Sequence, residues 1–373
     1  MPTDLLVLVS LLYAVPILAF AIAAAFARYP SDRQFRPKVS LVVAARNEES
    51  NIGRCLDSVA KIDYPRELLE AVIVDDRSTD RTAEIVREYC AQHPFIRLIS
   101  SEPGTGALRG KANAVTQGIE QTSGEIIALT DADCVVQPGW IKEVVGHFSD
   151  PKVGIVAGFT YLRGKRFFEQ MQALDWFGLF TVASGGVRMG ISITAVGTNL
   201  HVRRTAYEAT GGFRKIPFSV TEDYALFHAV TTQTKYRARF PINPSMLVDS
   251  MPCHDAKSLY NQRKRWFMGG RGMAFKYLIP FVLAYAGLLL LIIGIPTMWA
   301  TGNWTPFLIK FGADLGLLLP TIATYRKWSV LRAFPLFALY FYAYVLLFPP
   351  LVFFRRGIVW KDTQLRNRRQ DTA

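Results

Sequence analysis

The chain has 373 residues, half of them hydrophobic, and a formal net charge of +13. This length is enough for one large domain or two smaller ones. The hydrophobic residues crowd into residues 4–27 and the part after residue 278, whereas the middle, roughly 36–277, has ordinary globular composition.

The cysteines, histidines and charge exclude several classes of protein. The four cysteines are widely spaced and form no CxxC pair, which argues against a zinc site or a disulfide framework and fits a reducing compartment. His201, His228 and His254 are scattered, so we expect core or surface roles for them. No nucleic-acid-binding motif accompanies the basic charge, and we expect no nucleic-acid partner. Beside membrane segments, a basic surface suits anionic lipid head groups or a phosphate-bearing substrate.

The first predicted element is a membrane-spanning helix within residues 1–30. Residues 4–27 are apolar for longer than the core of a signal peptide, and no basic segment precedes them. Four basic residues follow the helix, at Arg28, Arg33, Arg36 and Lys38. Because basic flanks favour the cytoplasmic side, we predict an external N-terminus and a cytoplasmic middle region.

Strand and helix patterns alternate through residues 36–254. The expected strands are Val39–Ala44, Glu70–Val74, Ile96–Ile99, Ile126–Leu129 running into Asp131, and Val153–Ala157. Helices are expected from Asn47, from Ser78–Asp80 to about Tyr89, and over Gly110–Gln121, with acids in the first turn of the helix from Asn47. This alternation predicts an α/β domain with a mainly parallel sheet.

The C-terminal part has a membrane composition. Residues 167–183 are aromatic-rich with helical spacing and suit either a core or a membrane surface, and residues 255–277 suit an amphipathic interface helix. Residues 278–356 hold apolar stretches at about 278–300, 305–325 and 333–354, before a basic tail at 357–373. Three full spans would leave the basic residues after 354 outside, against the positive-inside tendency. We therefore expect the Pro-rich third stretch to be re-entrant or interfacial.

Two of the predicted strands end in pairs of acids. Asp75-Asp76 follows one strand, and Asp131-Ala132-Asp133 follows another. Open α/β sheets bind ligands at the carboxyl ends of their strands, where such carboxylates can hold a hard cation or a sugar hydroxyl. The alternative is that these acids only cap the helices that follow, one of which Pro138 would open.

Two further motifs follow in the chain. Thr221-Glu222-Asp223 comes after a Gly-Gly-Phe turn, and Gln262-Arg263-Lys264-Arg265-Trp266 lies in the amphipathic segment. Taken alone, the acids could be a solvated helix start and the basic residues a lipid-facing charge. The order and spacing of all four motifs together give a much stronger signal.

With these motifs, the sequence resembles the family 2 glycosyltransferases, which are inverting enzymes of GT-A fold. It is most similar to the membrane-bound branch that includes cellulose, chitin and hyaluronan synthases and ceramide glucosyltransferases. Supporting matches are Leu41–Glu48, Gly110–Ala114 and Gly197–Asn199, whereas Arg77 stands where many members carry Gly. The resemblance covers about residues 38–277 and implies that 36–254 is a cytoplasmic GT-A catalytic domain.

The resemblance also implies roles for individual residues. Asp133 would bind a divalent cation, Mg²⁺ or Mn²⁺, and Asp131 would contact ribose or the metal. Asp75 and Asp76 suit the uracil and ribose of a UDP-sugar, and Lys111 its base or phosphate. Asp223 would be the catalytic base, with Glu222 beside it. The remaining donor contacts would come from Gln262, Arg265 and Trp266, which offer an amide, a phosphate-binding fork and an apolar face.

The leading hypothesis is an integral membrane enzyme, in a bacterial inner membrane, that transfers a hexose from a UDP-sugar to a hydroxyl of a membrane lipid as a β-glycoside. A processive polysaccharide synthase is the alternative, and the modest membrane part favours the lipid. A catalytically inactive sugar-nucleotide-binding membrane protein is a third hypothesis. The intact acidic motifs and Arg265-Trp266 argue against it.

Overall fold

A seven-stranded sheet forms the centre of the α/β domain, in the order β3-β2-β1-β4-β7-β5-β8. In this computed structural model, which describes residues 2–105, 108–270, 285–354, 358–360 and 363–365, only β7 runs antiparallel to its neighbours. The strands are β1 Val39–Ala45, β2 Leu69–Asp75, β3 Ile96–Ser100, β4 Ile126–Asp131, β5 Val153–Ala157, β7 Leu200–Arg203 and β8 Arg237–Arg239. The predicted α/β fold with a mainly parallel sheet is confirmed.

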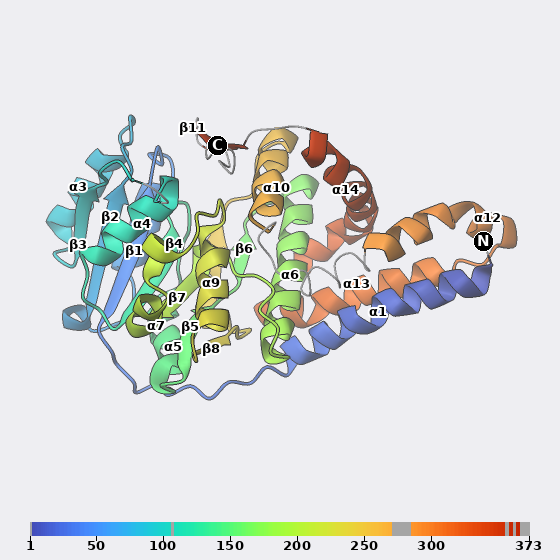
Figure 1. The fold of residues 1–373 in the computed structure, drawn as a ribbon, viewed down its shortest axis with the longest axis horizontal. Helices are drawn as coiled ribbons and strands as arrows, with labels where there is room; N and C mark the ends of the chain where they lie inside the picture. The colour runs from blue at the N-terminus through green and yellow to red at the C-terminus, as the bar shows by residue number, and fades with distance from the viewer. Residues whose placement is uncertain (1, 106–107, 271–284, 355–357, 361–362, 366–373) are drawn as a thin grey trace, which may run out of the picture.

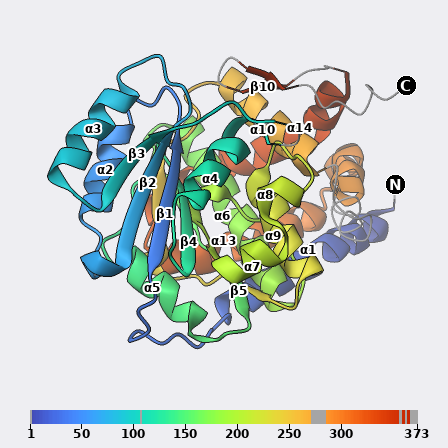
Figure 2. The same ribbon diagram turned by 60° about the vertical axis from the view of Figure 1, so that its left-hand side comes forward.

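Alternate residues of the central strands enter two separate hydrophobic cores, because successive side chains of a strand point to opposite faces. Leu41 and Val43 of β1 face the core that helices α2, α3 and α5 cover, whereas Val42 faces the core that α4, α6 and α9 cover. Figure 2 shows the helices on the two sides of the sheet. Burial on both faces explains why these strands are continuous apolar runs.

The helices connect and cover the strands. Their bounds in the α/β domain are α2 Ile52–Ala60, α3 Thr82–Gln92, α4 Gly110–Glu120, α5 Trp140–Gly146, α6 Phe167–Arg188, α7 Arg204–Ala209, α8 Gly212–Lys215, α9 Glu222–Gln233 and α10 Ala256–Gly270. The apolar helices are α1 Thr3–Ala25, α12 Ile295–Thr301, α13 Thr305–Tyr325 and α14 Phe334–Phe354. A small sheet pairs β6 Thr160–Leu162 with β9 Val248–Ser250, and β10 Ile358–Trp360 pairs with β11 Thr363–Leu365.

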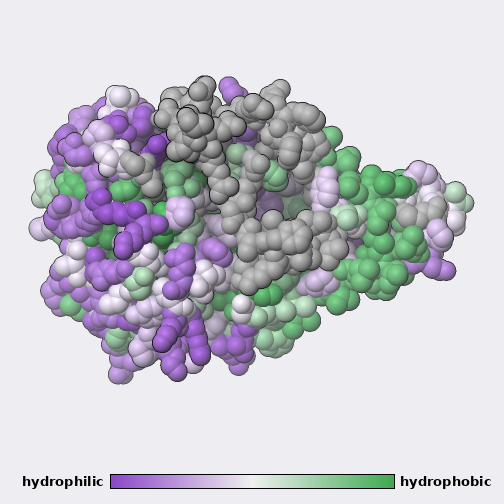
Figure 3. Space-filling model, viewed as in Figure 1, coloured by the Kyte–Doolittle hydropathy of each residue, from purple (hydrophilic) through white to green (hydrophobic). Residues whose placement is uncertain are grey.

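Helices α1 and α13 lie side by side and extend away from the α/β domain (Figure 1). Both are long and apolar enough to cross a membrane. Leu12 and Val15 of α1 are 67% and 65% exposed, and Figure 3 shows a hydrophobic surface over this end of the molecule. The structure thus fits a membrane attachment at this end.

Helix α6 joins the apolar helices to the α/β domain. Phe177 and Phe180 are fully buried in the same core as Val42 of the sheet, so this segment belongs to the core rather than to a membrane surface. On its other side α6 packs against α1 and α13. The Thr181 and Thr321 hydroxyls, on α6 and α13, lie 2.5 Å apart.

Two predictions for the C-terminal part remain predictions. Helix α14 is continuous from Phe334 to Phe354 although it contains Pro335, Pro349 and Pro350. A continuous helix does not decide between spanning and re-entry. Part of the predicted interface helix, residues 271–277, lies outside the described residues, as does most of the basic tail.

The predicted helix start at Asn47 is wrong, because α2 begins only at Ile52. Asn47 adopts a left-handed backbone conformation with φ of 52°. Its backbone N–H donates to Ser78 Oγ at 3.0 Å, and its side-chain oxygen accepts from the Thr79 N–H at 2.9 Å. The segment after β1 therefore pairs with the loop after β2 instead of starting a helix.

Candidate active site

The register of the central strands brings the strand-end acids to one edge of the sheet. Asp131 of β4 lies opposite Ala44 of β1, and Asp75 of β2 lies opposite Ala45. Strand β1 thus separates the two acidic motifs by one strand width. This edge is the carboxyl end of three parallel strands, where open α/β sheets bind ligands.

Asp75 and Asp76 are buried and do not cap α3. Asp75 Oδ1 accepts from the Ser78 N–H at 3.2 Å, and Asp76 Oδ1 accepts from the Ser101 hydroxyl at 2.6 Å. The cap of α3 comes from Asp80, which accepts from the Thr82 N–H at 3.0 Å. Asp76 Oδ2 is buried and lies 4.0 Å from Arg46 Nη1, but it accepts no hydrogen bond from a described residue and can accept one from a ligand.

The loop after Asp76 has a strained turn. Arg77 has a positive φ of 59°, a conformation that glycine adopts at lower cost. Its guanidinium lies 3.4 Å from Asp76 Oδ1. The loop therefore keeps a glycine-like backbone at the position where the resemblance leads us to expect Gly in many members.

Asp131 and Asp133 do not cap the helix that follows them. Helix α5 begins at Trp140 without a side-chain cap. Asp133 instead accepts from the Ser250 hydroxyl at 3.3 Å, and burial, followed by the charge of Asp131, raises the pKa of Asp133 to about 6. The charge of Lys111 acts in the opposite direction, and a bound cation would likewise favour the charged form of this carboxylate.

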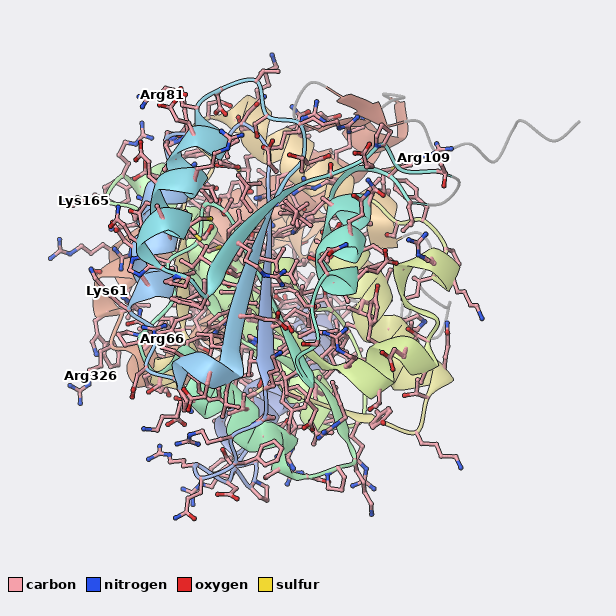
Figure 4. All side chains as sticks on the ribbon, turned by 90° about the vertical axis from the view of Figure 1, so that its left-hand side faces the viewer. Lys61, Arg66, Arg81, Arg109, Lys165 and Arg326 are labelled. Carbon is pink, nitrogen blue, oxygen red and sulfur yellow. The ribbon has the colours of Figure 1, made fainter. Side chains whose placement is uncertain are left out.

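Lys111 connects two of the acidic motifs. It lies in the first turn of α4, and its Nζ is 2.5 Å from Asp131 Oδ1 and 3.1 Å from Glu222 Oε1. Burial alone would lower the pKa of Lys111, but these carboxylates outweigh that effect and raise it. Lys61, by contrast, is exposed at the outside of the domain (Figure 4).

Asp223 lies at the start of α9 and is held by backbone groups. Its Oδ2 accepts from the Gly197 N–H at 2.6 Å, and its Oδ1 accepts from the Tyr224 N–H at 2.7 Å. Burial and the neighbouring Glu222 raise the pKa of Asp223 to about 6, and Lys111 acts in the opposite direction. Such a carboxylate is charged at neutral pH and can still accept a proton.

Gly197 leaves the space that these side chains occupy. A Cβ at this position would lie 3.1 Å from Lys111 Nζ and 3.4 Å from Asp223 Cβ. A larger side chain would therefore push the ammonium and the carboxylate apart. The role of the Gly197 amide in holding Asp223 was not among the sequence predictions, because it depends on a contact between segments 26 residues apart.

Helix α10 carries the fourth motif. Gln262, Arg265 and Trp266 are partly exposed, and the Gln262 Oε1 atom is buried without a hydrogen bond from a described residue. Gly269, one turn after the motif, lies against Thr221, because a Cβ there would be 2.0 Å from Thr221 Oγ1. This contact joins α10 to the segment that carries Glu222 and Asp223.

The basic residues of α10 do not all form a charged outer face. Arg263 is 4% exposed and Lys264 is 7% exposed. Arg263 forms an ion pair with Asp175 of α6, a residue that sequence reasoning missed. The available signal for Asp175 was an acid in the middle of an aromatic-rich helix.

The residues at this edge fit a divalent cation that a substrate helps to hold. Among the described residues, no group of three or more His, Cys, Asp or Glu side chains could hold a metal ion. The described residues therefore supply the acids around Asp133 but not a complete set of metal ligands. Mg²⁺ commonly binds through one or two carboxylates plus substrate phosphates, which matches this set.

Comparisons with known proteins agree with the fold and the family resemblance. The family model described as glycosyl transferase family 2 matches residues 40–211, and glycosyl transferase family group 2 matches residues 126–354. A mannosyltransferase from Pyrobaculum calidifontis, solved in complex with GDP-Man and Mn²⁺, shares the fold with a TM-score of 0.61 and 23% identity. That alignment covers 92% of this chain and 98% of the mannosyltransferase.

Two curated relatives are named for different products, a glycolipid and a polysaccharide. A β-monoglucosyldiacylglycerol synthase of Synechocystis sp. is 31% identical over 241 residues, 63% of this chain and 48% of the relative. A poly-β-1,6-N-acetyl-D-glucosamine synthase of Staphylococcus epidermidis is 28% identical over 246 residues, 64% of this chain and 56% of the relative. The chain thus spans about half the length of the curated relatives it matches.

Proposed function

The chain belongs to glycosyltransferase family 2, and we propose that it transfers a hexose from a UDP-sugar to a hydroxyl of a membrane lipid, with inversion to a β-glycoside. The observation that carries this proposal is the meeting of the strand-end acids, Lys111 and the Glu222-Asp223 pair at one sheet edge. This edge combines groups for a nucleotide diphosphate with a carboxylate that can act as a base.

The strand-end acids would bind the donor. Asp75 and Asp76 would accept hydrogen bonds from the base and ribose, and the Asp76 Oδ2 atom, which accepts no hydrogen bond from a described residue, supports this role. Asp133, helped by Asp131, would hold Mg²⁺ or Mn²⁺ together with the diphosphate. When bound, the cation neutralises the negative charge that develops on the leaving diphosphate. Lys111 and Arg265 bring further positive charge to the phosphates.

Inversion needs one displacement at the anomeric carbon and a base for the attacking hydroxyl. Asp223 accepts that proton, and its pKa of about 6 leaves it mostly ionised at neutral pH. The bonds from Gly197 and Tyr224 fix its orientation. Trp266 offers an apolar face to the sugar, and Gln262 a hydrogen-bonding amide.

A lipid acceptor is favoured by the apolar end of the molecule. A cavity of about 220 Å³ lies between α12, α13 and α14, and all its lining residues are apolar or aromatic, such as Leu291, Met298, Phe307 and Leu339. This volume is below the roughly 300–1,000 Å³ of pockets that enclose a whole small molecule, and it suits part of an acyl chain. The name of the Synechocystis relative supports the same acceptor class.

Membrane attachment through α1 and α13 would place the site at the surface of the bacterial inner membrane, with the catalytic domain in the cytoplasm. The basic residues after α1 support this orientation. A polysaccharide synthase remains the second candidate function, because the Staphylococcus relative is named as one.

The test is a donor panel. The protein in lipid nanodiscs is incubated with UDP-sugars, Mg²⁺ or Mn²⁺, and an extract of bacterial lipid. UDP release and radiolabelled product are measured. We expect release with at least one donor and a discrete glycolipid. A high-molecular-weight polymer would favour the synthase, and no release with any donor would contradict an enzymatic function.

A further inference from the structure

The helix that carries the Gln262–Trp266 motif is held by one face of α6. Gln172, Asp175 and Trp176 lie three and four residues apart on α6 and therefore share a face. Each contacts the segment that begins just before α10. These contacts meet the segment at Cys253, Arg263 and Trp266, in the same order as on α6.

The first contact fixes the chain entering α10. The Gln172 side chain, 3% exposed, accepts from the Cys253 N–H at 2.8 Å and donates to the Cys253 carbonyl at 2.9 Å. An amide that satisfies both backbone groups of one residue allows little rotation of that residue. The position at which α10 starts is therefore set by α6.

The second contact is a buried ion pair inside the motif. Arg263 and Asp175 have side chains only 4% and 18% exposed, and the Arg263 guanidinium also lies over the Trp266 ring at 4.3 Å. A third contact brings the Trp176 and Trp266 rings to 5.6 Å between centroids. The pair thus determines how α10 is rotated about its axis, and with it where Trp266 points.

Helix α6 is itself fixed at its other end. Ser184 Oγ donates to the Phe240 carbonyl at 2.6 Å, and a Cβ at Gly185 would lie 2.2 Å from the Phe20 carbonyl oxygen of α1. The far end of α10 meets Thr221 through Gly269. Helix α10 is therefore braced between α6 and the segment that carries Glu222 and Asp223.

We propose that Asp175, through its buried ion pair with Arg263, is a positioning residue that sets the rotation of α10 and so the placement of Gln262, Arg265 and Trp266 at the donor. The inference rests on the proposed function, because it assigns those residues to the donor site. Among the described residues, Arg263 is the one cationic side chain that forms an ion pair with Asp175.

The test compares two pairs of charges. The double variant Asp175→Asn with Arg263→Gln removes the buried pair without leaving one unpaired charge inside the protein, so it should still fold. The matched control removes the exposed pair between Glu120 and Arg214, whose side chains are 44% and 58% exposed, by Glu120→Gln with Arg214→Gln. Melting temperature, UDP affinity, and donor KM and kcat are measured for both in nanodiscs.

We expect the Asp175/Arg263 variant to melt close to the wild type but to lose on the order of 100-fold in kcat/KM, mostly as a higher donor KM, because a small misplacement of contact groups has effects of this size. Restoring only the charge pair as Asp175→Glu with Arg263 intact should recover part of the loss. The exposed-pair control should match the wild type.

Other outcomes separate the two claims. A folded Asp175/Arg263 variant with wild-type donor KM and kcat would overturn the positioning role while leaving the proposed function intact. A variant that loses its fold would make the pair structural and would also overturn the role. A wild-type protein without turnover on any UDP-sugar would contradict the proposed function itself.

Discussion

The strand-end acids and the residues of α10 are positioned by different kinds of contact. Asp75 and Asp131 are the last residues of β2 and β4, and their places are set by backbone pairing with β1. The motif of α10 depends on side chains of α6 and on the close contact between Gly269 and Thr221. Hydrogen-bonded strands fix an edge closely, whereas a helix held by side chains can rotate when one contact is lost.

This difference predicts a ranking of effects. Changes at the strand-end acids should remove chemistry and leave the structure unchanged. Changes around α10 should alter donor binding in a graded way. The predictions below follow that order, from the largest expected effect to the smallest.

Asp133→Ala should lower kcat/KM by about 10³-fold or more, because the developing diphosphate charge would lose its stabilisation. Stimulation by Mn²⁺ should disappear as well. Initial rates of UDP release are measured over a titration of Mn²⁺. The control is Asp63→Ala, an acid whose side chain is 72% exposed. Metal-stimulated turnover in the Asp133 variant would show that the ligand assignment is wrong.

Asp223→Asn should lower kcat by about 10²–10⁴-fold, the range that general-base catalysis contributes. UDP binding, followed by calorimetry, should survive, because the base does not hold the nucleotide in our assignment. Glu84→Gln changes another acid in the first turn of a helix and should have no effect. Loss of UDP affinity in the Asp223 variant would place this residue at the donor instead.

The strand-end half of this comparison was largely predictable from sequence, and the α10 half was not. A short apolar run that ends in Asp75 or Asp131 identifies a buried strand and its ligand-binding end by local pattern alone. The helix expected at Asn47 failed because Ser78 and Thr79, remote in sequence, bond to that residue.

Contacts between distant segments explain the rest of what was missed. In the sequence, Arg263 is one more basic residue of a predicted amphipathic helix. Its burial depends on Asp175, which lies 88 positions earlier in the chain. The link from Lys111 to Glu222 likewise joins two motifs that the sequence keeps apart. Periodicity and composition report local preference, and they carry no information on which distant side chain supplies a counter-charge.

Gly269→Ala tests the α10 side with a single methyl group. The added Cβ would collide with the Thr221 side chain, which is short and has no flexible end to move away. We expect kcat/KM to fall about 10- to 100-fold through displacement of α10. Gly53→Ala is the matched control, because a Cβ at Gly53 in helix α2 has its nearest neighbour at 3.9 Å. Equal kinetics for the two variants would argue against close packing of α10 on Thr221.

Lys111→Met should give the smallest effect, a rise in donor KM of about tenfold together with a change in pH dependence. In the wild type, kcat/KM should rise with pH as Asp223 becomes ionised, with a midpoint near pH 6 and a plateau at higher pH. Lys111 lowers the pKa of Asp223, so its removal should move this midpoint to higher pH. Lys61→Met, an exposed control, should leave the profile in place. A midpoint that moves to lower pH would contradict the assigned coupling.

The most direct test of the account is an experimental structure of the protein with a UDP-sugar and Mn²⁺. We predict that the metal contacts Asp133, that the uridine lies at Asp75 and Asp76, and that Arg265 and Trp266 of α10 contact the diphosphate and sugar. A nucleotide bound at the strand ends without contact to α10, or bound elsewhere on the protein, would contradict the claim that both regions form one donor site.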